Sequence, residues 1–236
     1  PMMTAINHAR AQAEDGVFGD TGRDAWRLGG DEMRRYSVRE IPTTWEVPIR
    51  LGLKEAELAR ADRLAKELEE LLPGKFQALE ERKRESLSAE QRAALAVPAM
   101  DRSEEQQQTA AAAEAALKVT WPLVAREAPA DVKAKAQELA RQFVEANETA
   151  EIIGRYRDIV NFDFWRATCE AEVTDEMLTA REATWRAERD FENARLQAAK
   201  KAYEEAFAAW RRVLDSSEVL RQDSLTGDDI KELIDR

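Results

Sequence analysis

Glycine and proline are distributed very unevenly along the 236 residues of this chain, and this distribution restricts the possible folds most strongly. Six of the nine glycines lie before residue 53, and six of the seven prolines lie before residue 123. From Ala130 to Leu214 the only residue of either type is Gly154. Because both residue types interrupt helices, the sequence predicts turns and irregular backbone early and long helices later.

The long helical pattern from residue 131 to residue 214 must nevertheless turn. A single unbroken helix of that length would be on the order of 120 Å long. Three positions combine a helix-capping residue with acids that favour a helix N-terminus. These candidate turns are residues 147–149, 174–176 and 190–193.

The middle of the chain carries clear helix signals. Residues 53–72 form an amphipathic helical pattern with one leucine- and alanine-rich stripe, and Pro73 and Gly74 end this helix. Residues 75–85 form a second helix. Ser88 and Gln91 have the spacing of a capping box, in which each side chain caps the backbone amide of the other residue.

A further helix is expected to begin after Ser103, with Glu104 and Glu105 in its first turn. It includes an alanine run that allows close helix packing. Pro122 is expected to kink this helix, and Pro129 to end the unit.

The N-terminal segment is expected to be richer in loops. Residues 2–14 fit a short helix, and residues 15–51 fit a loop-rich stretch with one helix around residues 24–36. Residues 41–48 must be extended, because Pro42 and Pro48 each disfavour helix in the preceding residue.

The predicted fold is all-α, an elongated array of helical hairpins and bundles with a loop-rich, partly extended N-terminal segment. Residues 1–52 form that segment and pack on the helices, residues 53–129 form helical hairpins, and residues 130–236 form the core. Ten of the sixteen aromatic residues lie in this last part, which also holds a hairpin and a short terminal helix after Thr226. The three parts are either separate or one continuous domain.

Within that core, residues 152–169 are apolar on more than one side. Ile153, Tyr156, Val160 and Phe164 share one face, and the residues around it are also apolar: Ile152, Ile159, Phe162, Trp165 and Cys169. This pattern predicts a central helix.

Residues 187–214 carry a local family resemblance. Ala187 and Ala199 lie twelve residues apart, followed by Tyr203 and Ala206, and this segment resembles a tetratricopeptide hairpin. It lacks the glycine between the helices and the closing proline, and the chain shows no second repeat. The resemblance implies helix-hairpin packing and a groove that binds a protein or peptide.

A second, shorter resemblance covers residues 87–91. Leu-Ser-Ala-Glu-Gln is similar to the LTxxQ signature of periplasmic stress chaperones, with serine in place of threonine. The capping box alone also explains this segment. If the resemblance holds, it implies a periplasmic accessory protein.

The charge balance argues against nucleic acid as a partner. The chain has 36 Lys and Arg against 47 Asp and Glu, a formal net charge of −11, which repels a phosphate backbone. No stretch approaches 18 consecutive apolar residues, so no membrane-spanning segment is expected. The start at Pro1 and Met2 leaves open an anchor or signal upstream, and hence a cytoplasmic or a periplasmic location.

The sequence offers no recognisable catalytic apparatus. His8 is the single histidine, and no phosphate-binding glycine motif occurs. The single cysteine, Cys169, fits a small buried hydrophobic residue better than a nucleophile. We therefore predict no catalytic, cofactor-binding or metal-binding residue. With 47 acids, carboxylate chemistry stays open, and Asp163, beside the candidate partners Arg157 and Arg166, is the acid to check.

Three tryptophans lie near loops, prolines or breaks in the helical pattern: Trp26, Trp45 and Trp121. They either anchor the N-terminal segment on the helices or form a partner-binding site. Three functional hypotheses follow. The first is a non-enzymatic structural protein that binds a protein partner or self-associates. The second is a periplasmic or membrane-tethered accessory protein of chaperone type, and the third is an enzyme that uses buried carboxylates.

Overall fold

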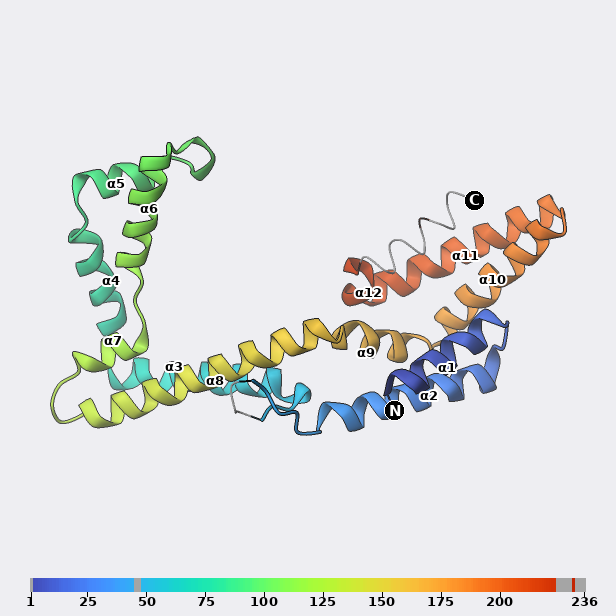
Figure 1. Cartoon of the computed structure of the whole chain (residues 1–236), viewed down its shortest axis with the longest axis horizontal. Coiled ribbons are helices and arrows are strands. Elements are labelled where there is room, and N and C mark those ends of the chain that lie inside the picture. The colour runs from blue at the N-terminus through green and yellow to red at the C-terminus, as the bar shows by residue number, and fades with distance from the viewer. Residues whose placement is uncertain (1, 45–47, 224–230, 232–236) are drawn as a thin grey trace. The chain divides into compact units, whose positions relative to one another are not determined.

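The computed structural model describes residues 2–44, 48–223 and 231, and within these residues the protein is all-α (Figure 1). Twelve α-helices and two 3-10 turns form the described regular structure, together with one isolated bridge between Ile41 and Ile49. The predicted fold class is therefore confirmed. Trp45 and the helix expected after Thr226 lie outside the described residues. None of the described helices has both the length and the apolarity needed to cross a bilayer.

The chain divides into two compact units. Unit 1 consists of residues Pro1–Leu53 together with Ile152–Arg236, and unit 2 consists of Lys54–Glu151. The N-terminal segment thus belongs to the same unit as the last third of the chain. The expected segment 130–236 is shared between the units, because the division falls inside helix α8 (Lys133–Ile159).

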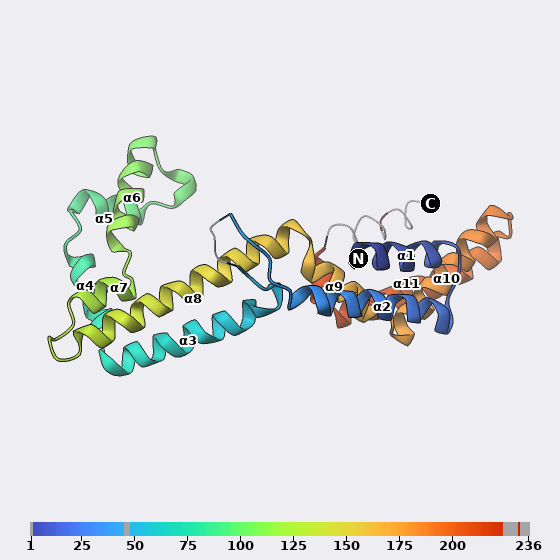
Figure 2. The ribbon, with the colours of Figure 1, turned by 60° about the horizontal axis from the view of Figure 1, so that its bottom comes forward.

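Unit 1 is built from two helical hairpins and the helices that connect them. Helices α1 and α2 lie side by side and pack with α9 around a common core (Figures 1 and 2). Its other elements are the end of α8, α10, α11 and α12. The bounds are α1 (Met2–Glu14), α2 (Gly19–Ser37), α9 (Phe162–Ala171), α10 (Asp175–Glu192), α11 (Leu196–Ser216), α12 (Glu218–Gln222) and a 3-10 turn (Leu51–Leu53).

Helix α2 begins earlier than the sequence predicts, at residue 19 rather than near residue 24. Its internal glycines serve packing, not turning. A Cβ on Gly29 would lie 3.4 Å from the Cys169 sulfur and 3.4 Å from Ile6, so glycine allows α1 and α9 to approach α2 closely. Gly16 does end α1 as expected: its φ is +77°, and a Cβ there would collide with Trp185.

A buried arginine joins the 3-10 turn Leu51–Leu53 to the corner between α8 and α9. Arg157 is 2% exposed, and its Nε donates a hydrogen bond of 2.7 Å to the carbonyl of Leu51. Its Nη1 lies 3.5 Å from the Asp163 carboxylate, and its guanidinium lies 5.3 Å from the centre of the Phe162 ring. The expected pairing of Asp163 with Arg157 and Arg166 is thus present.

The corner itself corrects two expectations. Helix α8 continues through residues 147–149, so no turn occurs there. The break lies at Asn161, whose φ of 49° ends the helical path between α8 and α9. The expected central helix is therefore two helices. Ile159, expected in the core, is 77% exposed just before the corner.

Helices α10 and α11 form an antiparallel hairpin. Arg186 on α10 pairs with Glu205 on α11 at 2.8 Å, and the Trp210 indole donates to Thr184 at 3.1 Å. Small side chains fill the contact between the helices. The buried alanines are Ala180, Ala183 and Ala187 on α10, and Ala199, Ala202, Ala206 and Ala209 on α11. The other two predicted turns are confirmed, with Thr174 capping α10 and a short loop after Glu192.

Unit 2 has its core between α3, α7 and the first part of α8. Leucines of α3 share a cluster with Ala136, Leu139 and Trp121, and α3 runs beside α8 (Figures 1 and 2). The bounds are α3 (Lys54–Leu71), α4 (Lys75–Glu85), α5 (Ala89–Ala96), α6 (Glu104–Leu117), α7 (Trp121–Arg126) and a 3-10 turn (Ala99–Asp101).

The local cap signals of unit 2 are confirmed. Ser88 with Gln91, and Ser103 with Gln106, each form a complete capping box. The expectation for Pro122 was wrong: it does not kink a continuous helix. Helix α6 ends at Leu117, and Pro122 lies in the first turn of α7, where its missing N–H has no hydrogen bond to lose.

Candidate partner-binding surfaces

Two of the three tryptophans considered for a partner site lie in hydrophobic cores. Trp26 is 3% exposed in the core of unit 1, and Trp121 is 9% exposed in the core of unit 2. The ring of Trp121 packs 4.9 Å from that of Phe76. Trp45 lies outside the described residues. The structure thus places Trp26 and Trp121 in different units, and a partner-binding role for the three stays a prediction.

The buried acids are matched by arginines. Glu172 is 5% exposed, and the Arg181 guanidinium donates to its carboxylate at 2.6 Å and 3.0 Å. Asp163 is less buried and lies 3.0 Å from Arg166. Among the described residues, no group of three or more His, Cys, Asp or Glu side chains could hold a metal ion.

Cys169 is buried, as its helical position predicts, and is 4% exposed. Burial raises the pKa of its thiol to about 12, and the carboxylates of Glu172 and Glu170 act in the same direction. The thiol lines a hollow of about 450 Å³ with Arg34 and Arg166, but these guanidiniums pair with Asp31 and Asp163. At neutral pH the sulfur is therefore a neutral thiol and a poor nucleophile.

A mostly apolar hollow lies in unit 1. Its volume is about 700 Å³, and it lies where the start of α1, the end of α2 and the α8–α9 corner meet. We call it the apolar hollow. Its apolar lining is Met2, Met3, Tyr36, Ile159, Val160 and Trp165, and its polar lining is Glu32, Arg35, Arg39 and Asn161.

The rim of the apolar hollow carries one unpaired cation. Arg35 forms an ion pair with Glu32, whereas the Arg39 side chain has no partner in the part of the chain that the structure describes. The Arg10 guanidinium lies over the Trp165 ring, 5.8 Å from the ring centre. The hollow thus combines an apolar floor with positive charge at its edge.

Sequence reasoning did not find this surface. Ile159 continues the apolar periodicity of α8, so the pattern alone places it in the core. Its exposure depends on the left-handed backbone of Asn161, which turns α9 away immediately afterwards. Met2 and Met3 belong to a short helix that gave no functional signal. The one sequence signal for this surface is Asn161, which follows shortly after the apolar end of α8.

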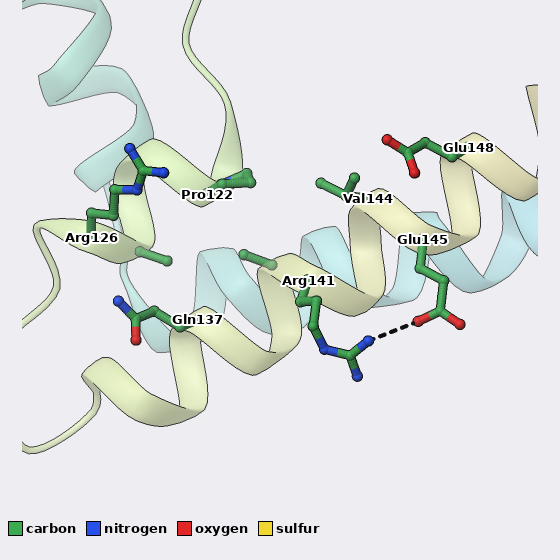
Figure 3. Close-up of a pocket in the computed structure, with 9 residues that line it drawn as sticks. Pro122, Arg126, Gln137, Arg141, Val144, Glu145 and Glu148 are labelled. Atoms are coloured by element: carbon green, nitrogen blue, oxygen red, sulfur yellow. Dashed lines mark hydrogen bonds and ion pairs between the residues drawn. The ribbon is translucent and has the colours of Figure 1, made fainter.

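A second surface is a groove between α7 and α8 in unit 2, with a volume of about 460 Å³ (Figure 3). We call it the α7–α8 groove. Its floor is made of Pro122, Ala125, Ala140 and Val144, and its polar edge of Arg126, Gln137, Arg141, Glu145 and Glu148. Ala125 and Ala140 are almost fully buried, so Pro122 and Val144 provide the exposed apolar part of the floor.

Comparison of the chain with protein-family models, with curated proteins and with solved structures gives no match.

Proposed function

We propose that this protein is a non-enzymatic interaction module whose apolar hollow in unit 1 binds an apolar segment of a partner protein. The observation that supports it is the exposure of Ile159, 77%, on the rim of a hollow of about 700 Å³. Single exposed apolar residues are common on protein surfaces, but a contiguous apolar hollow with an exposed isoleucine is typical of a contact site.

The chemistry of the hollow defines the partner segment. Large apolar side chains are needed to cover Ile159, Met3 and Trp165, and a carboxylate beside them would pair with Arg39. Burying an isoleucine of this exposure contributes roughly 1.5–3 kcal/mol to binding. That is the magnitude of an interface hot spot.

Site-specific photocrosslinking tests the proposal in cells of the source organism. A photoreactive amino acid replaces Ile159, and the control places it at Leu28, which is 48% exposed on α2 and outside the hollow. A defined adduct is expected from position 159 and none from position 28. A cross-link between two copies of this chain would show that the module self-associates through the hollow.

The partner is then purified and its affinity measured. Ile159→Asp is expected to weaken binding at least tenfold, since about 1.4 kcal/mol corresponds to a tenfold change in Kd. Leu28→Asp should leave Kd within about twofold. Equal adducts from both positions, or an unchanged Kd for Ile159→Asp, would show that the hollow is not the binding site.

A further inference from the structure

The α7–α8 groove leaves one face of α8 uncovered over about three helical turns. Gln137, Arg141, Val144 and Glu148 follow one another at intervals of four, three and four residues, so they share a face. From Gln137 to Glu148 the face is about 16 Å long. Helix α3 covers the opposite side of α8, where Leu139 lies in the core of unit 2.

Two charges in the groove have no side-chain partner among the residues that the structure describes. The Arg141 guanidinium is matched on both sides, by Glu138 at 2.7 Å and by Glu145 at 3.1 Å. In contrast, neither Arg126 nor Glu148 has a side-chain partner among the described residues. Figure 3 shows Arg126 and Gln137 at one end of the groove and Glu148 at the other. The groove therefore has a positive end and a negative end.

The floor fits a helix better than an extended chain. Both walls are helices, whose backbone N–H and C=O groups are already bonded, so an added strand would find no backbone partners. A helix satisfies its own backbone. Pro122 and Val144 are the partly exposed apolar residues of the floor that a third helix can contact, because Ala125 and Ala140 are already buried.

We infer that the α7–α8 groove binds a helix of a partner protein. That helix presents small or apolar residues to the floor, and it bears a carboxylate toward Arg126 and a cation toward Glu148, ten to twelve residues apart. Opposite charges at the two ends fix the direction of the bound helix. This site is in unit 2 and is independent of the apolar hollow, so the protein can hold two different partners.

A displayed library of 16-residue helical peptides, selected on the whole chain, provides the probe. The selection is repeated on the charge-swapped variant Arg126→Glu/Glu148→Arg. Peptides enriched on the native chain are expected to carry an acid and a base ten to twelve residues apart. Peptides enriched on the variant should carry them in the reverse order.

The binding of one selected peptide is then measured. Either single substitution is expected to weaken Kd at least fivefold, and swapping the charges of the peptide should restore binding to the charge-swapped variant. Arg63→Glu and Glu70→Arg serve as matched controls, because both residues are exposed on α3 outside the groove. They should change Kd less than twofold. Because Arg126 and Glu148 have no described partner, circular dichroism should show folded protein in every variant.

Several outcomes would overturn the inference. Peptides enriched equally on both proteins would show that the two charges do not select the ligand. Enriched peptides rich in proline would point to an extended occupant. Sedimentation that shows self-association of the native chain, lost in the charge-swapped variant, would identify the occupant as a second copy. If Ile159→Asp abolished peptide binding, the peptide would bind in the apolar hollow and not in the groove. In that case the groove inference would fail while the proposed function of the hollow would stand.

Discussion

Replacing Arg157 by methionine removes the guanidinium and keeps much of the buried volume. The hydrogen bond to the Leu51 carbonyl is charge-assisted and contributes roughly 1.5–3 kcal/mol. Leu51 is fully buried, so its carbonyl would lose a partner as well. The Asp163 carboxylate is about one-third exposed and keeps its ion pair with Arg166. Losing its contact with Arg157 therefore costs little free energy. We expect a total cost of about 3 kcal/mol, within the range for breaking a buried ionic contact.

The chain has two compact units, so a single unfolding curve would mix their transitions. Hydrogen exchange followed by mass spectrometry separates them. In Arg157→Met, the amides of α2 and α9 in unit 1 should exchange roughly 100-fold faster, because about 1.4 kcal/mol corresponds to a factor of ten. The amides of α3 and α4 in unit 2 should not change.

Arg166→Met is the matched control, because Arg166 contacts the same carboxylate from a half-exposed position. A surface pair of this kind contributes less than about 1 kcal/mol. Arg157→Lys should fall between the two variants, since an ammonium cannot reproduce both directed contacts. If Arg157→Met cost no more than Arg166→Met, the buried guanidinium would not be the link that stabilises the contact between the 3-10 turn and the α8–α9 corner.

Three further predictions concern the thiol, a surface carboxylate and the α10–α11 hairpin. Cys169 should not react with a thiol reagent in the native protein at pH 8 and should react fully in denaturant, because burial holds its pKa at about 12. The pKa of Glu138 is lowered to about 2 by hydrogen bonds from Arg141 and Gln142. The stabilisation from these contacts is therefore present above the ordinary pKa near 4.5 and is lost as the pH falls toward 2. In Arg141→Gln, the pKa of Glu138 should rise toward its ordinary value, and an NMR titration of the variant measures this rise. Ala206→Leu should destabilise the hairpin by about 1–3 kcal/mol in hydrogen exchange, whereas Ala208→Leu on the exposed side of α11 should have little effect.

The elements predicted well from the sequence are those that short-range chemistry determines. Ser88 and Ser103 cap helices because their partners lie three residues away, and Gly16 ends α1 because its backbone needs a positive φ. The glycines of α2 misled the prediction because their reason is long-range. Gly29 allows close contact with Cys169 and Ile6, and no local pattern shows that contact.

The two candidate surfaces could not be predicted from the sequence, because they too depend on long-range contacts. The apolar hollow joins residues from both ends of unit 1, and the exposure of Ile159 depends on where Asn161 turns the chain. In the α7–α8 groove, Arg126 and Glu148 are two of 83 charged side chains in the sequence. Only the structure shows that Arg141 and Glu145 beside them are paired, and that these two have no side-chain partner within the described part of the chain.

The salt dependence of binding should distinguish the α7–α8 groove from the apolar hollow. The groove presents exposed charges, and ions screen such charges over about 10 Å at 0.1 M and about 3 Å at 1 M. Raising NaCl from 0.05 M to 0.5 M should therefore weaken peptide binding in the groove several-fold. Binding in the apolar hollow should change little in NaCl and tighten in sulfate, which favours burial of apolar surface. If both ligands lost affinity in parallel, the charge of Arg39 rather than the apolar surface of Ile159 would dominate binding in the hollow, and its partner segment would not be mainly apolar.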